Sequence, residues 1–262
     1  MADQPNFVLV PDPDPSTDAP SRPAASLLGQ LRSLAVATGS WLARRQAAIA
    51  GSEATPLTAW SGRARLVFGF DATASREPAW ATARQVTDAL VRALPGELDV
   101  ALAVHGGSRL HTFTEFTADP NTLRDRAASI TCRAGHTQLL PLLSRSLASP
   151  GLRVITYIGD VYEESPARGR KLADELGCQG IRLIVLHDIA HWTARRDAEL
   201  FLDLARRTGG CVLPFDASAA GLLRELLAAI AVFAVGGAEL LQDKRGELPG
   251  AALLLRHLKG NG

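Results

Sequence analysis

The sequence predicts an α/β fold built on a doubly wound, mostly parallel sheet with one antiparallel edge strand. From about Arg63 onward, short and almost continuously apolar runs alternate with helical stretches. Such runs are typical of parallel strands that helices cover on both faces. Gly106-Gly107 lies between two of the runs and indicates a tight hairpin turn, which requires one antiparallel pair.

Six strands are expected in this part of the chain. Most are buried apolar runs, whereas the run at 110–116 alternates apolar and polar residues, as suits the edge of a sheet. The expected strands cover residues 65–70, 98–104, 110–116, 152–158, 181–186 and 211–215.

Local signals place helices between these strands. Asp119-Pro120 and Ser165-Pro166 each combine a capping side chain with proline at the first helical position. Pro95-Gly96, Gly177 and Gly209-Gly210 are typical helix ends. The expected helices cover 77–94, a stretch from 120, 138–148, 166–177, 193–207 and a stretch from 218.

Composition excludes several classes of protein. The 262 residues, 47% hydrophobic and 21% charged, fit a soluble globular chain. Lys+Arg (28) and Asp+Glu (27) leave a net charge of +1, which argues against a strongly basic nucleic-acid-binding protein. The three cysteines lack metal-site spacing, so a disulfide scaffold is not expected and a reducing, cytoplasmic compartment fits best.

Four segments are expected. Residues 1–25, rich in Pro and Asp and without the features of an export signal, are predicted to be disordered. Residues 26–62 form a helical segment and linker; packing on the main domain, docking to a partner and lying on a membrane surface all stay open. The main domain covers 63–242, and 243–262 forms a tail or short helix.

The last expected helix contains an uncharged run of 13 residues from Leu226 to Ala238. A membrane span needs about 20 residues, so a buried core helix is favoured. Together with Leu253–Leu255 the run leaves two other roles open, an oligomer face and contact with a membrane surface.

Oxygen-bearing side chains follow two of the strands. Asp71 comes directly after the first strand, with Thr73 and Ser75 on the same loop, and Asp160 follows the strand at 152–158. Thr137 lies in a loop between them. Ligands of open parallel sheets sit beyond the carboxyl ends of the strands. Carboxylates and hydroxyls without sulfur form a hard-oxygen set that suits Mg²⁺ or Mn²⁺.

This ordered set resembles the metal-ion-dependent adhesion site (MIDAS) of the von Willebrand factor A (VWA) domain family. The family pattern is Asp-x-Ser-x-Ser, then a distant Thr, then an Asp after the central strand. The resemblance spans about residues 64 to 235, including the segment LARRTGGCVLPF at 204–215. Three positions depart from it: Thr73 replaces Ser, and His136 and Val161 stand where Gly is common.

The resemblance implies binding of a partner protein and not catalysis. It implies metal ligation by Asp71, Thr73, Ser75, Thr137 and Asp160, with both carboxylates acting partly through water. An Asp or Glu of a partner protein would complete the metal shell. The rim of the site is expected at His136, Tyr162, Glu163 and Glu164. Bacterial VWA domains often act beside AAA+ ATPases or in assembly complexes, so a partner of that kind is an expectation.

Two other functions stay open: a VWA-fold scaffold with an idle metal site, and a Mg²⁺-dependent hydrolase. The dehalogenase-type hydrolase pattern needs an Asp where Thr73 stands, and the glycine-rich nucleotide motifs are missing. His187 to His191 resembles a zinc-protease motif, but His187 ends an expected strand and not a helix. His105 and His111 flank the hairpin and are expected to be surface histidines.

Overall fold

The structure is a computed structural model that describes residues 62–73, 77–106, 109–132, 136–188, 194–215 and 218–260. The chain divides into two compact units, Met1–Ser52 and Glu53–Gly262, and every described residue belongs to the second. The expectations for residues 1–25 and for almost all of 26–62 therefore lie outside the described residues, as does Ser75.

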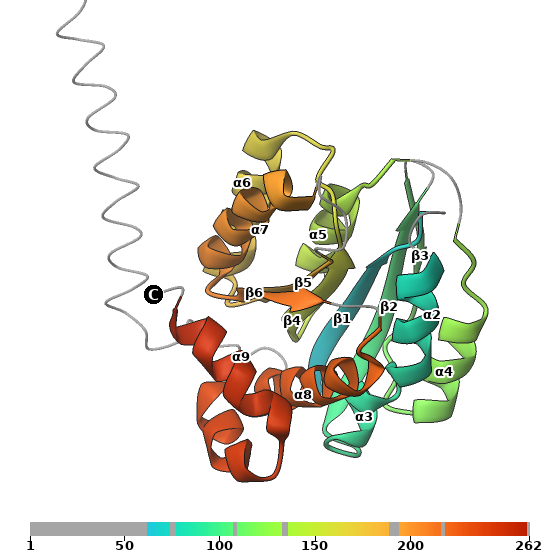
Figure 1. Cartoon of the computed structure of the whole chain (residues 1–262), viewed down its shortest axis with the longest axis vertical. Coiled ribbons are helices and arrows are strands. Elements are labelled where there is room, and N and C mark those ends of the chain that lie inside the picture. The colour runs from blue at the N-terminus through green and yellow to red at the C-terminus, as the bar shows by residue number, and fades with distance from the viewer. Residues whose placement is uncertain are drawn as a thin grey trace, which may run out of the picture. The chain divides into compact units, whose positions relative to one another are not determined.

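The described strands form one sheet in the order β3-β2-β1-β4-β5-β6 (Figure 1). Among the described strands, β2 and β3 pair antiparallel and the other pairings are parallel. This confirms the expected doubly wound sheet with one antiparallel edge strand. The strands are β1 (Ala64–Asp71), β2 (Leu98–Gly106), β3 (Arg109–Phe113), β4 (Leu152–Gly159), β5 (Arg182–Asp188) and β6 (Cys211–Phe215).

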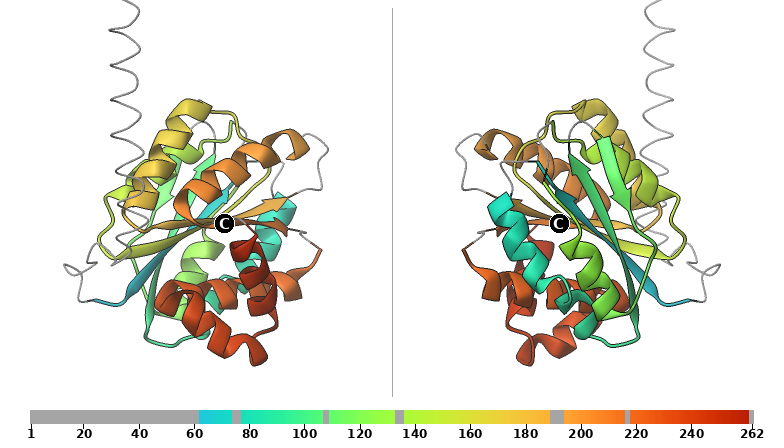
Figure 2. Two further views of the ribbon diagram at one scale, coloured as in Figure 1. Left: turned by 90° about the vertical axis from the view of Figure 1, so that its left-hand side faces the viewer. Right: turned by 90° about the vertical axis from the view of Figure 1, so that its right-hand side faces the viewer.

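Helices cover both faces of the sheet (Figures 1 and 2). Alternate residues of β1 divide between two cores, because successive side chains of a strand point to opposite faces. Phe68 belongs to the core that contains residues of α2, α3, α4, α8 and α9, whereas Val67 belongs to the core that contains residues of α5, α6 and α7. The helices are α2 (Glu77–Val86), α3 (Ala89–Arg92), α4 (Pro120–Ala128), α5 (Leu139–Leu147), α6 (Pro166–Cys178), α7 (Ala194–Thr208), α8 (Ala220–Asp243) and α9 (Pro249–Lys259).

The helix starts predicted from capping signals are confirmed. The Asp119 carboxylate accepts hydrogen bonds from the backbone N–H groups of Asn121 and Thr122 at the start of α4. The Ser165 hydroxyl accepts one from Arg168 N–H at the start of α6. These caps satisfy N–H groups that the helices themselves leave unpaired.

Two expected elements differ from the structure. The helix expected at 77–94 is divided into α2 and α3 at a turn, where the Thr87 hydroxyl donates to the Ala83 carbonyl at 2.7 Å. The strand expected at 110–116 ends at Phe113, because the next hydroxyl, that of Thr114, accepts the hydrogen bond from Leu102 N–H at 2.9 Å. In both places a threonine hydroxyl competes with the backbone pattern.

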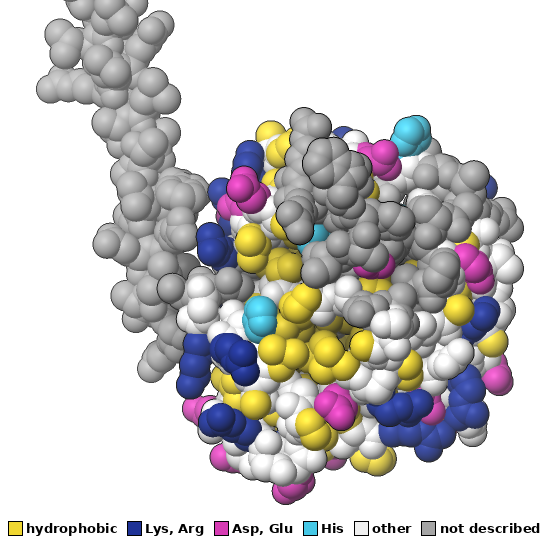
Figure 3. Space-filling view, in the orientation of Figure 1, with side chains coloured by type: hydrophobic (Ala, Val, Ile, Leu, Met, Phe, Trp, Pro, Cys, Tyr) yellow, Lys and Arg dark blue, Asp and Glu magenta, His cyan; other side chains and the backbone are white. Residues whose placement is uncertain are grey.

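Asp88, in the turn between α2 and α3, connects three segments of one face. Its carboxylate lies 2.8 Å from Arg92 Nε and 3.7 Å from guanidinium nitrogens of Arg124 on α4 and Arg224 on α8. Figure 3 shows basic side chains gathered at the lower right with acidic ones among them. Each exposed ion pair contributes little to the free energy of unfolding. The main effect of the ion pairs around Asp88 is to fix the positions of α3, α4 and α8 relative to one another.

The apolar C-terminal helix is part of the core. By length and composition alone, Ala220–Gly246 could cross a membrane, but 44% of its most apolar window is buried within the structure. Gly237, with φ 67° and ψ −158°, interrupts the helical backbone of α8. The following helix, α9, packs on α8 and buries Leu254 completely. The expectation of a buried helix is therefore confirmed for the inner face of α8.

The double glycine after α7 generates a test of packing. A Cβ at Gly210 would overlap the backbone carbonyl of Leu183 on β5, which has no room to shift. We expect Gly210→Ala to lower the free energy of unfolding by about 1–3 kcal/mol, measured by urea denaturation. The matched control is Gly221→Ala in α8, where a Cβ meets nothing within 4 Å. That change should be neutral or stabilise by up to about 1 kcal/mol, and equal effects at the two positions would contradict the close approach.

Candidate metal centre

The candidate site lies where the strand order reverses. β2 and β3 follow β1 on one side of the sheet, and β5 and β6 follow β4 on the other, so the ends of β1 and β4 flank the switch point at which such sheets bind ligands. Phe70 of β1 pairs with Ile158 of β4. Asp71 and Asp160 follow this pair by one and two residues, so both predicted carboxylates lie at the same edge.

Asp71 and Thr137 are brought together although 66 residues separate them. The Thr137 hydroxyl donates to Asp71 Oδ2 at 2.7 Å. The Thr73 backbone N–H donates to the other carboxylate oxygen, Oδ1, at 3.0 Å. Asp71 is completely buried, and Thr73, Thr137 and Asp160 are less than a tenth exposed. The structure thus joins Asp71, Thr73 and Thr137 by hydrogen bonds, and Asp160 is buried just beyond the end of the neighbouring strand.

The donor chemistry of this region fits a hard divalent cation. Two carboxylates and two hydroxyls supply oxygen only, which Mg²⁺ and Mn²⁺ prefer. Within the described residues, no group of three or more His, Cys, Asp or Glu side chains could hold a metal ion. A cation at this edge would therefore depend on the hydroxyls of Thr73 and Thr137 as well as on the two carboxylates.

His187 belongs to a strand end and not to a zinc-binding helix. His187 and Asp188 are the last residues of β5, so the spacing of one helical turn is missing, and His191 lies outside the described residues. The His187 ring lies 3.1 Å, through Nε2, from the backbone carbonyl oxygen of Asp160. A carbonyl only accepts, so this nitrogen donates and helps to hold the Asp160 turn.

His105 is a buried member of the site that the sequence interpretation placed wrongly on the surface. It pairs with Asp71 in the β1–β2 register and is completely buried. Its Nδ1 accepts from Gln138 N–H at 3.3 Å, and its Nε2 lies 3.0 Å from the Tyr157 hydroxyl. The alternation of β2 puts His105 on the same face as Ala103, which was the signal for burial.

His105 is neutral at neutral pH, so its ring supplies no positive charge beside Asp71. Burial, with a smaller contribution from the charge of His111, lowers the pKa of His105 to about 3. Its Nδ1 lies 3.9 Å from Asp71 Oδ1, but this nitrogen is occupied as an acceptor and carries no proton. The contact is therefore not an ion pair at neutral pH.

Of the four predicted rim residues, His136 and Glu163 are exposed, Glu164 is half-buried and Tyr162 is buried. The His136 side chain is 76% exposed. Tyr162 is buried, donates to the Ser165 carbonyl at 3.1 Å and packs edge-on against Phe201. Glu163 accepts from Thr137 N–H at 2.7 Å, and Glu164 accepts from Leu140 N–H at 2.8 Å. Burial raises the pKa of the Glu164 carboxyl.

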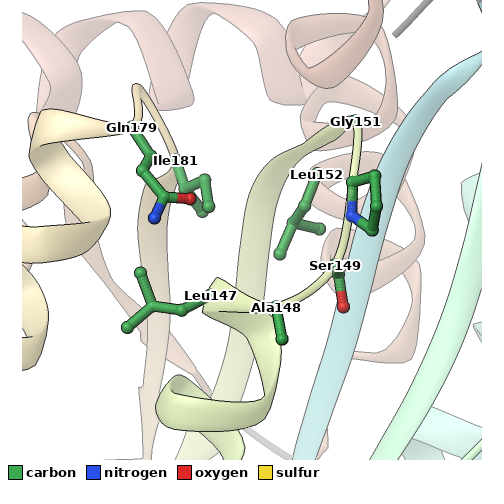
Figure 4. A pocket seen from close by; sticks show the side chains of 8 residues that line it. Leu147, Ala148, Ser149, Gly151, Leu152, Gln179 and Ile181 are labelled. Carbon is green, nitrogen blue, oxygen red and sulfur yellow. The ribbon is translucent and has the colours of Figure 1, made fainter. Parts of the chain in front are cut away.

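A small pocket lies at the opposite end of the sheet from this site. It has a volume of about 210 Å³ and lies beside the start of β4, between the turns that precede β4 and β5 (Figure 4). Leu152, Ile181 and Gln179 are among its lining residues, and none of the lining side chains is charged. It offers no charged side chain for acid–base chemistry or metal binding.

The neutral state of His105 makes stability depend on pH. The unfolded chain binds a proton near the ordinary pKa of 6.5, whereas the folded chain does so only near 3. The free energy of unfolding should therefore fall as the pH falls below 6.5, by about 1.4 kcal/mol per unit from this group. Denaturant unfolding with EDTA between pH 4 and 8 would measure it. His105→Gln should lose this part of the slope, and identical slopes in both proteins would contradict the assignment.

Comparison with known proteins supports the fold and no finer assignment. No protein-family model and no curated protein matches the chain. Among solved structures, it is similar to a von Willebrand factor type A protein from Catenulispora acidiphila, with 16% identity, a TM-score of 0.52, and coverage of 67% of this chain and 43% of that one. It is also similar to proximal thread matrix protein 1 from the mussel byssus, with 13% identity, a TM-score of 0.50, and coverage of 65% and 46%.

The chain spans less than half the length of each of these two structures. Identities this low establish shared architecture alone, which agrees with the strand order and helix layers described above. The chain has the VWA fold, as the resemblance in its sequence implied.

Proposed function

We propose that this chain is a metal-ion-dependent protein–protein interaction module that binds a carboxylate of a partner protein. The observation that supports it most directly is the 2.7 Å hydrogen bond between Thr137 and Asp71. It brings together oxygen ligands from separate segments at the edge where this architecture binds ligands. VWA domains often mediate protein–protein interaction, and the fold of this chain agrees with that role.

Asp71, Thr73, Thr137 and Asp160 would hold Mg²⁺ or Mn²⁺, with Ser75 as the fifth proposed ligand. When bound, the cation supplies a Lewis-acidic position at which an Asp or Glu of the partner can bind. The chain's own residues favour a cation at this position and shape the approach of a partner. The buried carboxylates attract a cation, and neutral His105 adds no competing positive charge. The exposed ring of His136 lies beside Thr137, where a partner would approach.

The proposed role is binding without turnover. Asp71 is the only carboxylate on its loop, since Thr73 stands where a dehalogenase-type hydrolase needs its second Asp. Asp71 is also completely buried and accepts hydrogen bonds from Thr73 N–H and the Thr137 hydroxyl, which makes it a poor nucleophile. We propose the bacterial cytoplasm as the setting and an AAA+ ATPase or an assembly complex as the kind of partner. The cysteines, which form no disulfide, support a reducing compartment.

The first test is calorimetric titration of Mg²⁺ and Mn²⁺ into the full chain. We expect saturable binding that Asp71→Ala weakens by at least about 100-fold, because even outer-shell partners of a metal site are worth 10- to 100-fold. The control is Asp125→Ala. Asp125 is an exposed acid on α4, and α4 packs on the face of the sheet opposite to that of α5, the helix that follows Thr137. Equal affinity of the Asp71 and Asp125 variants would contradict the proposed site.

The second test asks whether partner binding depends on the metal. Affinity capture from the source cells is carried out in Mg²⁺ and then washed with EDTA. We expect the captured partners to be released by EDTA and to be missing with Asp71→Ala, because both changes remove the position that a partner carboxylate occupies. Partners that resist EDTA but are lost when residues 1–60 are deleted would instead support a scaffold with an idle metal site.

A further inference from the structure

One short loop carries both a proposed metal ligand and two carboxylates that contact a second ligand segment. Asp160 follows β4, and Glu163 and Glu164 come three and four residues later. Both glutamates reach the segment that leads into α5, which contains Thr137. Two loops that are distant in sequence are thus joined by carboxylate-to-backbone hydrogen bonds.

Glu164 supplies the cap that α5 lacks in its own sequence. Gln138, at the N-cap position, makes no side-chain capping hydrogen bond. The Glu164 carboxylate accepts from Leu140 N–H at 2.8 Å instead. A carboxylate at a helix N-terminus also interacts favourably with the helix dipole. The start of α5 is therefore fixed by a residue of another loop.

Glu163 fixes Thr137 itself. Its Oε2 accepts from Thr137 N–H at 2.7 Å, and its Oε1 lies 3.3 Å from His136 Nδ1. The side chain of the same threonine donates to Asp71. Thr137 is thus held at its backbone by Glu163 and at its hydroxyl by Asp71, so its hydroxyl stays at the candidate metal centre.

The loop that carries the glutamates is anchored in turn. The Tyr162 ring packs among buried residues of the α5–α7 face, against Phe201. A Cβ at Gly169 of α6 would meet the Tyr162 hydroxyl, so the glycine makes room for this anchor. Because the loop after β4 is anchored, the carboxylates of Glu163 and Glu164 have defined positions. They can therefore fix the position of the Thr137 loop.

We propose that Glu163 and Glu164 are positioning residues that preorganise Thr137 for the metal and couple the Asp160 loop to the Thr137 loop. This inference rests on the proposed function. It adds a role within the fold to the rim role expected of the two glutamates, and His136 and Glu163 are the exposed side chains of the rim set. Preorganised ligands bind a metal more tightly because less ordering is needed on binding.

The test uses the full chain with Glu163→Ala, Glu163→Gln and the control Glu175→Ala, an exposed glutamate of α6. Two quantities are measured: the Kd for Mg²⁺, and amide hydrogen exchange of Thr137 in the metal-free protein by NMR. We expect Glu163→Ala to weaken Mg²⁺ binding by about tenfold and to speed Thr137 exchange by a similar factor. Glu163→Gln keeps an acceptor oxygen and should stay within about twofold of the unchanged chain.

The outcomes separate this inference from the proposed function. If the unchanged chain binds no Mg²⁺, the proposed function fails and the role at the metal fails with it. If the unchanged chain binds Mg²⁺ and Glu163→Ala binds equally well, only the positioning role is overturned. A loss in Glu163→Gln as large as in Glu163→Ala also overturns it, because charge and not hydrogen bonding would then be responsible.

Glu164→Ala tests the second hydrogen bond by the same two measurements. Exchange of the Leu140 amide should become about tenfold faster, because this substitution removes the acceptor of that N–H. Mg²⁺ binding should weaken less than in Glu163→Ala, because Leu140 is not a proposed ligand. Unchanged exchange of Leu140 would overturn the capping role of Glu164.

Discussion

The buried carboxylate of Asp71 is the constraint on which the rest of the site depends. A charge removed from water is costly unless hydrogen bonds or opposite charge stabilise it. Here the Thr73 backbone N–H and the Thr137 hydroxyl donate to it. The second donor comes from a distant segment, so burial of the carboxylate is favoured when that segment lies beside the end of β1. The need for hydrogen bonds thus favours the observed position of the Thr137 loop.

The neighbouring loops also form hydrogen bonds with the segment before α5. Gln138, next to Thr137, donates its backbone N–H to His105, and the ring of His105 continues to Tyr157 on β4. On the outer side, the acceptors are the carboxylates of Glu163 and Glu164. The segment before α5 is therefore held from below by β2 and from outside by the loop after β4. Each contact satisfies a polar group that would otherwise be buried at a cost.

The sequence predicted those features that depend on local signals or on a general rule of topology. The caps at Asp119 and Ser165 depend on neighbouring residues, and the placement of Asp71 and Asp160 at one edge follows from where parallel strands end. The contact of Thr137 with Asp71 was implied only by the resemblance to the VWA family. The break at Thr87 was missed because the choice of a threonine hydroxyl between helix and turn depends on packing. The hydrogen bonds that Glu163 and Glu164 accept from Thr137 and Leu140 were missed because long-range pairs leave no periodic pattern.

The departures from the family pattern become understandable in this network. Where the family commonly has Gly after the strand-end Asp, this chain has Val161, followed by Tyr162, whose ring packs on Phe201. A loop with an anchored aromatic residue has fewer conformations than one that begins with glycine. His136, the other residue that stands where Gly is common, contacts Glu163 and remains exposed. Val161 and His136 lie on the two loops that the glutamates join, so this chain restrains by packing and hydrogen bonds a region where glycines would leave the backbone freer.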